Sequence, residues 1–266
     1  MVSDGARARI RAFVHGIEDR SATQRIPCAY GVALFNPDFP RSWAHNFVRL
    51  EGDLSTVGVD ALVAEAERLH SAAGHAHRRI STDDDAVGTR LRGGFEERGW
   101  STDRLVTMVH RRAPESAADV GAVEEVGFDV VRPALEELWR AGPYADSEET
   151  VRQLVERSAL TAAATDVRHF AIRVQGRVAS TCDLYSDGRT AQVEDVSTLE
   201  EFRGRGYARA TVLRAVEEAR AAGCDLVFLV ADAEDWPRQL YGRLGFDEVG
   251  RAYDFTRPPA DPVDGR

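Results

Sequence analysis

The chain has 266 residues, of which 43% are hydrophobic and 29% charged. This composition is typical of a globular protein, and the length fits two domains of about 100–150 residues. The formal net charge of −10 at pH 7 argues against a protein that binds the phosphate backbone of nucleic acids. No run approaches the roughly 18 consecutive apolar residues that span a membrane, and residues 1–20 lack the apolar stretch of a secretory signal. We therefore expect a cytoplasmic protein with no membrane partner.

The basic residues are all arginine, because the 34 lysine and arginine positions include no lysine. A Schiff-base lysine and the lysine of a P-loop are thereby excluded, so a phosphate site must use arginine and backbone amides. Cys28, Cys182 and Cys224 are far apart and odd in number, which predicts neither a disulfide framework nor a metal site. His75 and His77 stand two residues apart, and this fits a polar strand end better than a metal site without further ligands.

In chain order, the first half alternates candidate strands with two helices. Hydrophobic patterning predicts strands at 29–35, 44–50, 75–80 and 105–109, and helices at 59–73 and 85–97. Residues 112–119 are small and polar and contain a proline, which is typical of a domain linker. The order of elements resembles that of the second half, which suggests a diverged internal repeat with a period of about 130 residues.

The second half has a clearer pattern. It predicts strands at 123–126, 169–174, 178–185, 191–198, 226–230 and 246–255, and helices at 130–140, 148–164, 207–222 and 236–244. Gln175-Gly176 and Asp187-Gly188 are hairpin turns between the three central strands. We therefore predict an α/β fold with a central mixed sheet flanked by helices in each half. The predicted domains are residues 1–113 and 114–257, followed by a disordered tail at 258–266.

Residues 203–208, Arg-Gly-Arg-Gly-Tyr-Ala, form the turn that points to chemistry. Gly204 and Gly206 let the backbone take a positive φ and approach a ligand closely. The helix that follows supplies unpaired amides and the positive end of its dipole, and Arg203 and Arg205 add charge. We interpret the turn as a cradle for a pyrophosphate. It is neither a Walker A loop, which needs Gly-Lys-Ser/Thr, nor a Rossmann loop, which needs a third glycine.

Arg-x-x-Gly-x-Ala at Arg203, Gly206 and Ala208 resembles the acetyl-CoA motif of the GNAT superfamily of N-acetyltransferases. Residues 240–246, Leu-Tyr-Gly-Arg-Leu-Gly-Phe, resemble the second signature of that family. The resemblance implies transfer of acetyl from acetyl-CoA, as co-substrate, to a primary amine of a small molecule or peptide, without a metal. The first half carries neither motif, and the acidic residues in 49–58 would repel a pyrophosphate. We therefore expect a tandem form with a degenerate first half and one active site.

The resemblance also implies roles for single residues. Tyr241 would protonate the leaving thiolate, although a packing role beside Leu244 is the alternative. An amide near Val196 would polarise the thioester carbonyl. Asp235 stands where many members have an asparagine, and an ionised carboxylate accepts hydrogen bonds without donating them. The residues expected to bind acetyl-CoA are Val196, Thr198, Arg203, Gly204, Arg205, Gly206, Tyr207, Ala208 and Asp235.

Glu194 is the candidate base that takes a proton from the amine, and a solvated strand charge is the alternative reading. Strand alternation would put Gln192, Glu194, Val196 and Thr198 on one face. It would point Asp195 the other way. Asp183, on the neighbouring strand, is a second candidate for binding the amine, and we expect Trp236 to be buried or to cover the cofactor.

Two rival functions stay open. One is a transferase that uses another acyl-CoA or an acceptor that is not an amine, and the other is an acyl-CoA-binding sensor or scaffold without turnover. We see no need for a covalent enzyme intermediate, since Cys182 and Cys224 fit buried positions. Two halves of one chain resemble a dimer, so a monomer is plausible beside a homodimer.

Overall fold

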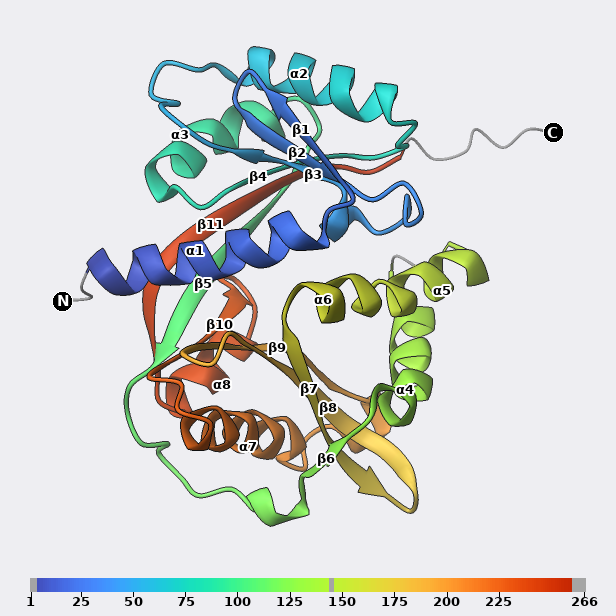
Figure 1. Ribbon diagram of the computed structural model, residues 1–266, viewed down its shortest axis with the longest axis vertical. Helices are drawn as coiled ribbons and strands as arrows, with labels where there is room; N and C mark the ends of the chain where they lie inside the picture. The colour runs from blue at the N-terminus through green and yellow to red at the C-terminus, as the bar shows by residue number, and fades with distance from the viewer. Residues whose placement is uncertain (1–3, 144–145, 260–266) are drawn as a thin grey trace. The chain divides into compact units, whose positions relative to one another are not determined.

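The structure is a computed structural model that describes residues 4–143 and 146–259 (Figure 1). The chain divides into two compact units, of which unit 1 comprises Met1–Ile17 and Val106–Val249 and unit 2 comprises Glu18–Leu105 and Gly250–Arg266. These units differ from the predicted domains, because helix α1 (Asp4–Ser21) and strands β5 (Ser101–His110) and β11 (Phe246–Arg257) contribute residues to both. Of the predicted tail, residues 260–266 lie outside the described residues.

Unit 1 contains a mixed sheet in which the strands follow the order β5-β10-β9-β8-β7-β6. Strands β6 to β9 pair antiparallel with their neighbours, whereas β9 and β10 pair parallel. The two predicted hairpin turns are confirmed, and their glycines, Gly176 and Gly188, have φ of 82° and 84°. The bounds are β6 (Glu124–Val126), β7 (Asp166–Val174), β8 (Arg177–Ser186), β9 (Thr190–Thr198) and β10 (Leu226–Asp232).

Helices cover both faces of this sheet (Figure 1). On one face, α7 packs a row of small and branched residues, among them Val212 and Val216, against Val193 and Leu229. On the other face, α4 packs Val131 and Ala134 against Ala171. The helices of unit 1 besides α1 are α4 (Phe128–Ala141), α5 (Glu148–Glu156), α6 (Ser158–Ala164), α7 (Tyr207–Ala221) and α8 (Pro237–Arg243).

The helix predicted at 148–164 is in fact two helices, α5 and α6. The Ser158 hydroxyl donates to the Val155 carbonyl at 2.8 Å, and a side chain that competes for a main-chain acceptor interrupts regular helix geometry. Arg157, between the two helices, lies over the Trp139 ring at 4.9 Å. The single-helix prediction was therefore wrong at this point.

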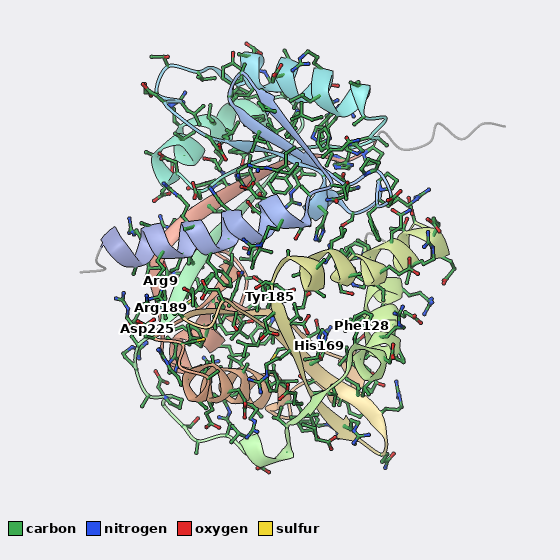
Figure 2. All side chains as sticks on the ribbon, in the orientation of Figure 1. Arg9, Phe128, His169, Tyr185, Arg189 and Asp225 are labelled. Carbon is green, nitrogen blue, oxygen red and sulfur yellow. The ribbon has the colours of Figure 1, made fainter. Side chains whose placement is uncertain are left out.

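The sequence did not predict α1, whose first part packs on unit 1. Ile10, Phe13 and Ile17 are buried there, and the Phe13 ring meets the Phe228 ring edge-on at 5.7 Å. The Arg9 side chain donates to Thr190 at 2.8 Å and to the Arg189 carbonyl, and it forms an ion pair with Asp225 (Figure 2). An apolar stripe and an arginine thus attach this helix to the starts of β9 and β10.

Unit 2 has the strand order β1-β2-β3-β4-β11, with β3 parallel to β4 and the other pairs antiparallel. Its core contains Phe35, Leu62, Phe95 and Phe255. Its other elements are β1 (Gln24–Cys28), β2 (Gly31–Phe35), β3 (Phe47–Leu50), β4 (Arg78–Thr82), α2 (Val59–Ala72) and α3 (Asp85–Glu96). The prediction of a repeat, with a degenerate first half, stays a prediction.

The strand predicted at 75–80 begins only at Arg78, the first residue paired with β11, and His75 and His77 lie before it. The Nδ1 atoms of His70 and His75 lie 3.1 Å apart, and His77 Nε2 lies 2.9 Å from the Asn46 carbonyl oxygen. All three imidazoles are buried. Instead of a polar strand end, the sequence forms a buried histidine cluster, which we define as His70, His75 and His77.

None of the helices formed by the described residues combines the length and the apolar composition that crossing a lipid bilayer requires.

Candidate functional site

The glycine-rich turn leads into the N-terminus of α7. Gly204 and Gly206 have φ of 75° and 81°, a left-handed conformation that favours glycine. A Cβ atom at Gly206 would come within 4 Å of no atom except Arg209 Nη2, at 3.8 Å. The backbone conformation, rather than crowding by the protein, therefore requires glycine here. Gly206 is the N-cap of α7, and its lack of a side chain leaves the first-turn amides uncapped.

Two arginine side chains flank these amides. Arg203 Nε donates to the Thr198 carbonyl and Arg205 Nη2 to the Glu201 carbonyl, each at 3.3 Å, and both residues are exposed. Neither arginine forms an ion pair with a described residue. Tyr207 and Ala208 open the helix, and Tyr207 packs against the core beneath it. The turn combines uncapped amides with available positive charge, which is the arrangement that binds an anion.

Strands β9 and β10 pair over only part of their length. Their parallel ladder runs from Thr190–Leu226 to Val193–Leu229. Beyond it, β9 continues from Glu194 to Thr198 and β10 from Val230 to Asp232. Backbone groups on this stretch of β9 are thus free of β10, as the addition of an extended ligand would require.

A β-bulge interrupts β9 where this unpaired stretch begins. Asp183 lies opposite Glu194, but Thr181 lies opposite Ser197, so β9 has one extra residue between these pairs. Asp195 takes a φ of 47°, which is uncommon for a residue with a side chain. A bulge reverses the faces of the residues beyond it, so the bulge has consequences for the predicted site.

The expectation that Glu194, Val196 and Thr198 share a face was wrong for this reason. Val196 packs against the same core as Val193, and the Thr198 hydroxyl lies 2.9 Å from that of Ser180. Glu194 faces the opposite side of the sheet with its cross-strand partner Asp183. Asp195, expected to point away, accepts a hydrogen bond from the Tyr185 hydroxyl at 3.5 Å.

Glu194 is therefore part of an acidic cluster, which we define as Asp183, Glu194 and Asp195, on the face opposite α7. Burial, together with the negative charge of Asp195, raises the pKa of Glu194 to about 8. The Gln192 amide and the Asp195 backbone hydrogen-bond to its carboxylate and oppose this shift. Burial also raises the pKa of Asp183, against the lowering effect of its hydrogen bond with His169. A carboxylate with a pKa near 8 is a stronger base than an exposed one.

Tyr241 lies on α8, and its side chain packs in the core on the α7 face. It is 8% exposed, and its ring lies 6.2 Å from that of Phe246. Its hydroxyl makes no hydrogen bond with a described residue. Burial raises the pKa of Tyr241, and the negative charge of Glu194 raises it further. The phenol thus stays protonated at neutral pH, as a proton donor must, and it also fills core space.

Gly245, in the second signature, has a structural reason to be glycine. Its φ is 96°, and a Cβ atom there would lie 2.0 Å from the Arg112 carbonyl oxygen. The amides of Arg111 and Arg112 donate to the Gly245 carbonyl at 2.9 and 3.1 Å. The segment predicted as a linker therefore packs directly against the turn that follows α8.

The loop between β10 and α8 carries Asp235 and Trp236. Asp235 is exposed, and its carboxylate accepts the Trp236 amide at 2.7 Å. Trp236 is 60% exposed, so the expectation that it is buried in the protein was wrong. Pro237 occupies the first turn of α8, where proline costs no hydrogen bond. The described residues contain no group of three or more His, Cys, Asp or Glu side chains arranged to hold a metal ion.

His169 and Tyr185 contact the acidic cluster, and the sequence did not predict a role for either residue. His169 Nδ1 lies 2.7 Å from Asp183 Oδ1, and its ring packs 5.6 Å from that of Phe128 (Figure 2). Each residue follows the normal alternation of side chains along its strand, β7 or β8, so the face of the sheet on which it lies was predictable. The partner was not, because a bulge between Ile172 and Arg173 shifts the register.

Comparisons with known sequences bear on the same segment. Residues 131–246 match the model of the acetyltransferase (GNAT) family. Over 65 residues, or 24% of this chain, the sequence is 31% identical to CgeE, an uncharacterized N-acetyltransferase of Bacillus subtilis (strain 168). The matched segment spans only 25% of that relative's length.

Solved structures share the fold of this chain. A GCN5-related N-acetyltransferase from Kribbella flavida is 17% identical, covers 100% of both chains and gives a TM-score of 0.63. A functionally unknown conserved protein from Staphylococcus epidermidis is 15% identical, with 89% of this chain and 94% of that chain covered and a TM-score of 0.65. A tandem GNAT protein from the clavulanic acid biosynthesis pathway is 16% identical, with coverage of 83% and 75% and a TM-score of 0.51. At these identities the likeness concerns the fold, and it confirms the predicted α/β architecture.

Proposed function

From the match of residues 131–246 to the acetyltransferase (GNAT) family model, we propose that this chain is an acyltransferase of that family, and that it transfers an acetyl group from acetyl-CoA directly to a primary amine. The observation that carries the proposal is the uncapped N-terminus of α7, which follows two glycines with positive φ beside the unpaired end of β9. These features supply an anion site and a strand edge next to each other. Acetyl-CoA has a pyrophosphate and an extended amide-bearing arm that need such a pair of sites.

The backbone of residues 203–208 would bind the pyrophosphate, with Arg203 and Arg205 neutralising its charge. The free backbone of Val196 and Thr198 would pair with the pantetheine arm. The exposed carboxylate of Asp235 already accepts the Trp236 amide at Oδ1, so fewer acceptor sites are left for that arm. The contribution of Asp235 is thus expected to be smaller than that of the turn.

The chemistry needs three proton transfers. The acceptor arrives as an ammonium ion, and Glu194 takes one proton so that the neutral nitrogen attacks the thioester carbonyl carbon. The C–N bond forms and the C–S bond breaks. Tyr241 gives its hydroxyl proton to the departing thiolate, and the second proton lost by the nitrogen replaces it. A backbone amide of the bulge near Val196 would stabilise the oxyanion.

The electrostatics of the two side chains support these roles. A base with a pKa of about 8 is matched to the removal of a proton from an ammonium ion near neutral pH. The charge of Glu194 acts on Tyr241 and raises the pKa of that phenol. The acid and the base therefore influence one another, although they face opposite sides of the sheet.

The direct test is thiol release from acetyl-CoA in the presence of a panel of amines, with the acetylated product identified by mass spectrometry. We expect release that depends on both substrates. Acetyl-CoA binding without release across aliphatic, aromatic and peptide amines would instead favour a sensor or scaffold. Faster release with a longer acyl-CoA would favour a different acyl donor.

A matched pair of variants tests the binding site itself. Gly206→Asp adds bulk and negative charge at the N-terminus of α7 and should abolish binding of CoA in calorimetry. Gly188→Asp is the control, because Gly188 also has a positive φ, with no atom within 4 Å of its Cβ position, but lies in the β8–β9 turn. If Gly206→Asp binds CoA as tightly as Gly188→Asp does, the turn is not the pyrophosphate site.

A further inference from the structure

Three polar side chains form a row across three adjacent strands of unit 1. His169 on β7 lies opposite Asp183 on β8, and Asp183 lies opposite Glu194 on β9. Residues directly opposite one another on antiparallel strands share a face, with Cβ atoms about 4.5–5.5 Å apart. The row therefore links the candidate base to a histidine two strands away.

At the end of the row away from Glu194, His169 and Asp183 form a short, largely buried hydrogen bond. His169 Nδ1 donates to Asp183 Oδ1 at 2.7 Å, and the two side chains are 12% and 9% exposed. Although burial lowers the pKa of His169, its hydrogen bond and charge interaction with Asp183 outweigh this, and the pKa is raised. A protonated imidazole is the group that keeps a buried carboxylate ionised.

The other charges around the row are mostly negative. Asp195 from β9 acts on His169, Asp183 and Glu194, and Tyr185 from β8 adds a half-buried phenol. Arg157, between α5 and α6, acts on Tyr185, and Tyr241 of α8 is influenced by Glu194. On α4, Arg132 lies over the Phe128 ring that packs beside His169. His169 is therefore the cation in direct contact with Asp183.

We propose that His169 is a positioning residue of the reaction: it holds Asp183 as a carboxylate beside Glu194 and thereby makes Glu194 a stronger proton acceptor. Without the imidazole, Asp183 would be buried with no cation in contact and would take up a proton. Its negative charge beside Glu194 would then be lost, and Glu194 would give up its own proton at a lower pH. The effect of His169 on the reaction rate rests on the proposed function, but its effect on the proton affinity of Glu194 is present without substrates.

The test measures the titration of Glu194 in the full-length protein by NMR with carboxyl-labelled glutamate, with the signal assigned by its loss in Glu194→Gln. We expect His169→Phe and Asp183→Asn each to lower the midpoint of Glu194 by about one pH unit, a tenfold change in proton affinity. The double variant should show the same shift as either single variant, because both remove the same charge. His169→Asn keeps a donor near the position of Nδ1, so the midpoint of Glu194 in this variant should lie between those of the wild type and His169→Phe.

Glu217→Gln is the control, since it removes one negative charge from an exposed position on α7. It should leave the midpoint of Glu194 unchanged. An unchanged midpoint in His169→Phe and Asp183→Asn, in proteins whose amide spectra show the native fold, would overturn the proposal. Additive shifts in the double variant would also overturn it, because the two residues would then act separately.

The kinetic measurement separates this inference from the proposed function. If the wild type acetylates an amine, the acid limb of its kcat/KM profile should move to lower pH in His169→Phe by the same amount as the NMR midpoint, with KM for acetyl-CoA unchanged. A protein that shows the NMR shifts but no turnover with any amine would contradict the proposed function and leave the role of His169 toward Glu194 supported. Turnover with an unmoved acid limb would contradict the inference alone.

Discussion

Glu194→Gln should stabilise the folded protein at high pH while it impairs the proposed reaction. The pKa of Glu194 is raised from its ordinary value of 4.5 to about 8, mainly by burial. Each unit of difference between the folded and unfolded pKa corresponds to about 1.4 kcal/mol, so ionising this carboxylate costs the folded state on the order of 5 kcal/mol. Partial exposure of the residue makes this figure an upper limit.

The sign of the effect fixes the pH window. A carboxyl whose pKa is higher in the folded than in the unfolded state binds its proton more tightly when folded. Its contribution to stability is therefore complete below pH 4.5 and is lost as the pH rises to about 8. Glutamine has no proton to lose, and its amide is similar in shape to the protonated carboxyl. The variant should thus keep the stability that the wild type loses over this interval.

Urea unfolding at a series of pH values between 4 and 9 measures the difference. We expect the free energies of unfolding to be similar at pH 4 and to diverge steadily, with Glu194→Gln the more stable protein at pH 9. Glu217→Gln, at an exposed site on α7, should follow the wild type throughout. Parallel curves for the wild type and Glu194→Gln would refute the reasoning, because Glu194 would then titrate as an exposed carboxylate.

Three further outcomes are expected. Tyr241→Phe should lower kcat by about 10²-fold with little change in KM for acetyl-CoA, and an unchanged rate with chemistry limiting would remove Tyr241 from the mechanism. Burial lowers the pKa of His70 to about 3 and of His77 to about 4, so unit 2 should lose stability as the pH falls from 6.5 to about 4, and equal hydrogen-exchange protection of α2 at pH 4 and 7 would contradict this. Phe13→Ala should cost about 3–5 kcal/mol in urea unfolding, whereas the exposed Arg7→Ala should cost almost nothing, and equal costs would contradict the packing of α1 on unit 1.

The sequence predicted those parts of the fold that depend on local patterns. The helix at 207–222 and the buried strand at 226–230 show clear periodicity, and the structure forms them within two residues of the predicted bounds. The glycine turn before α7 was predictable because the positive φ of Gly206 is a local requirement. The whole of α1 was missed, although Ile10, Phe13 and Ile17 stand at helical spacing, and the structure shows that this stripe packs on unit 1.

The candidate site depends on bulges, which local patterns do not reveal. Counting back from the Gln175-Gly176 turn would place His169 opposite Cys182, but a bulge between Ile172 and Arg173 moves it opposite Asp183. Alternation likewise failed at Asp195, whose positive φ is unusual for an aspartate. Each bulge is determined by the pairing of two strands over their whole length. A prediction from residue types alone therefore assigns these side chains the wrong neighbours.

The bulge in β9 also explains how one strand serves two substrates in the proposed reaction. In a regular strand, Glu194 and Val196 would project to the same face, and the base would compete for space with the residues that hold the pantetheine arm. The bulge turns Val196 and Thr198 toward the α7 core and leaves Glu194 beside Asp183 on the other face. The arm would then be held by backbone groups at the strand edge while the amine approaches Glu194 from the opposite side. The strained φ of Asp195 is thus the local feature on which the separation of the two reactants depends.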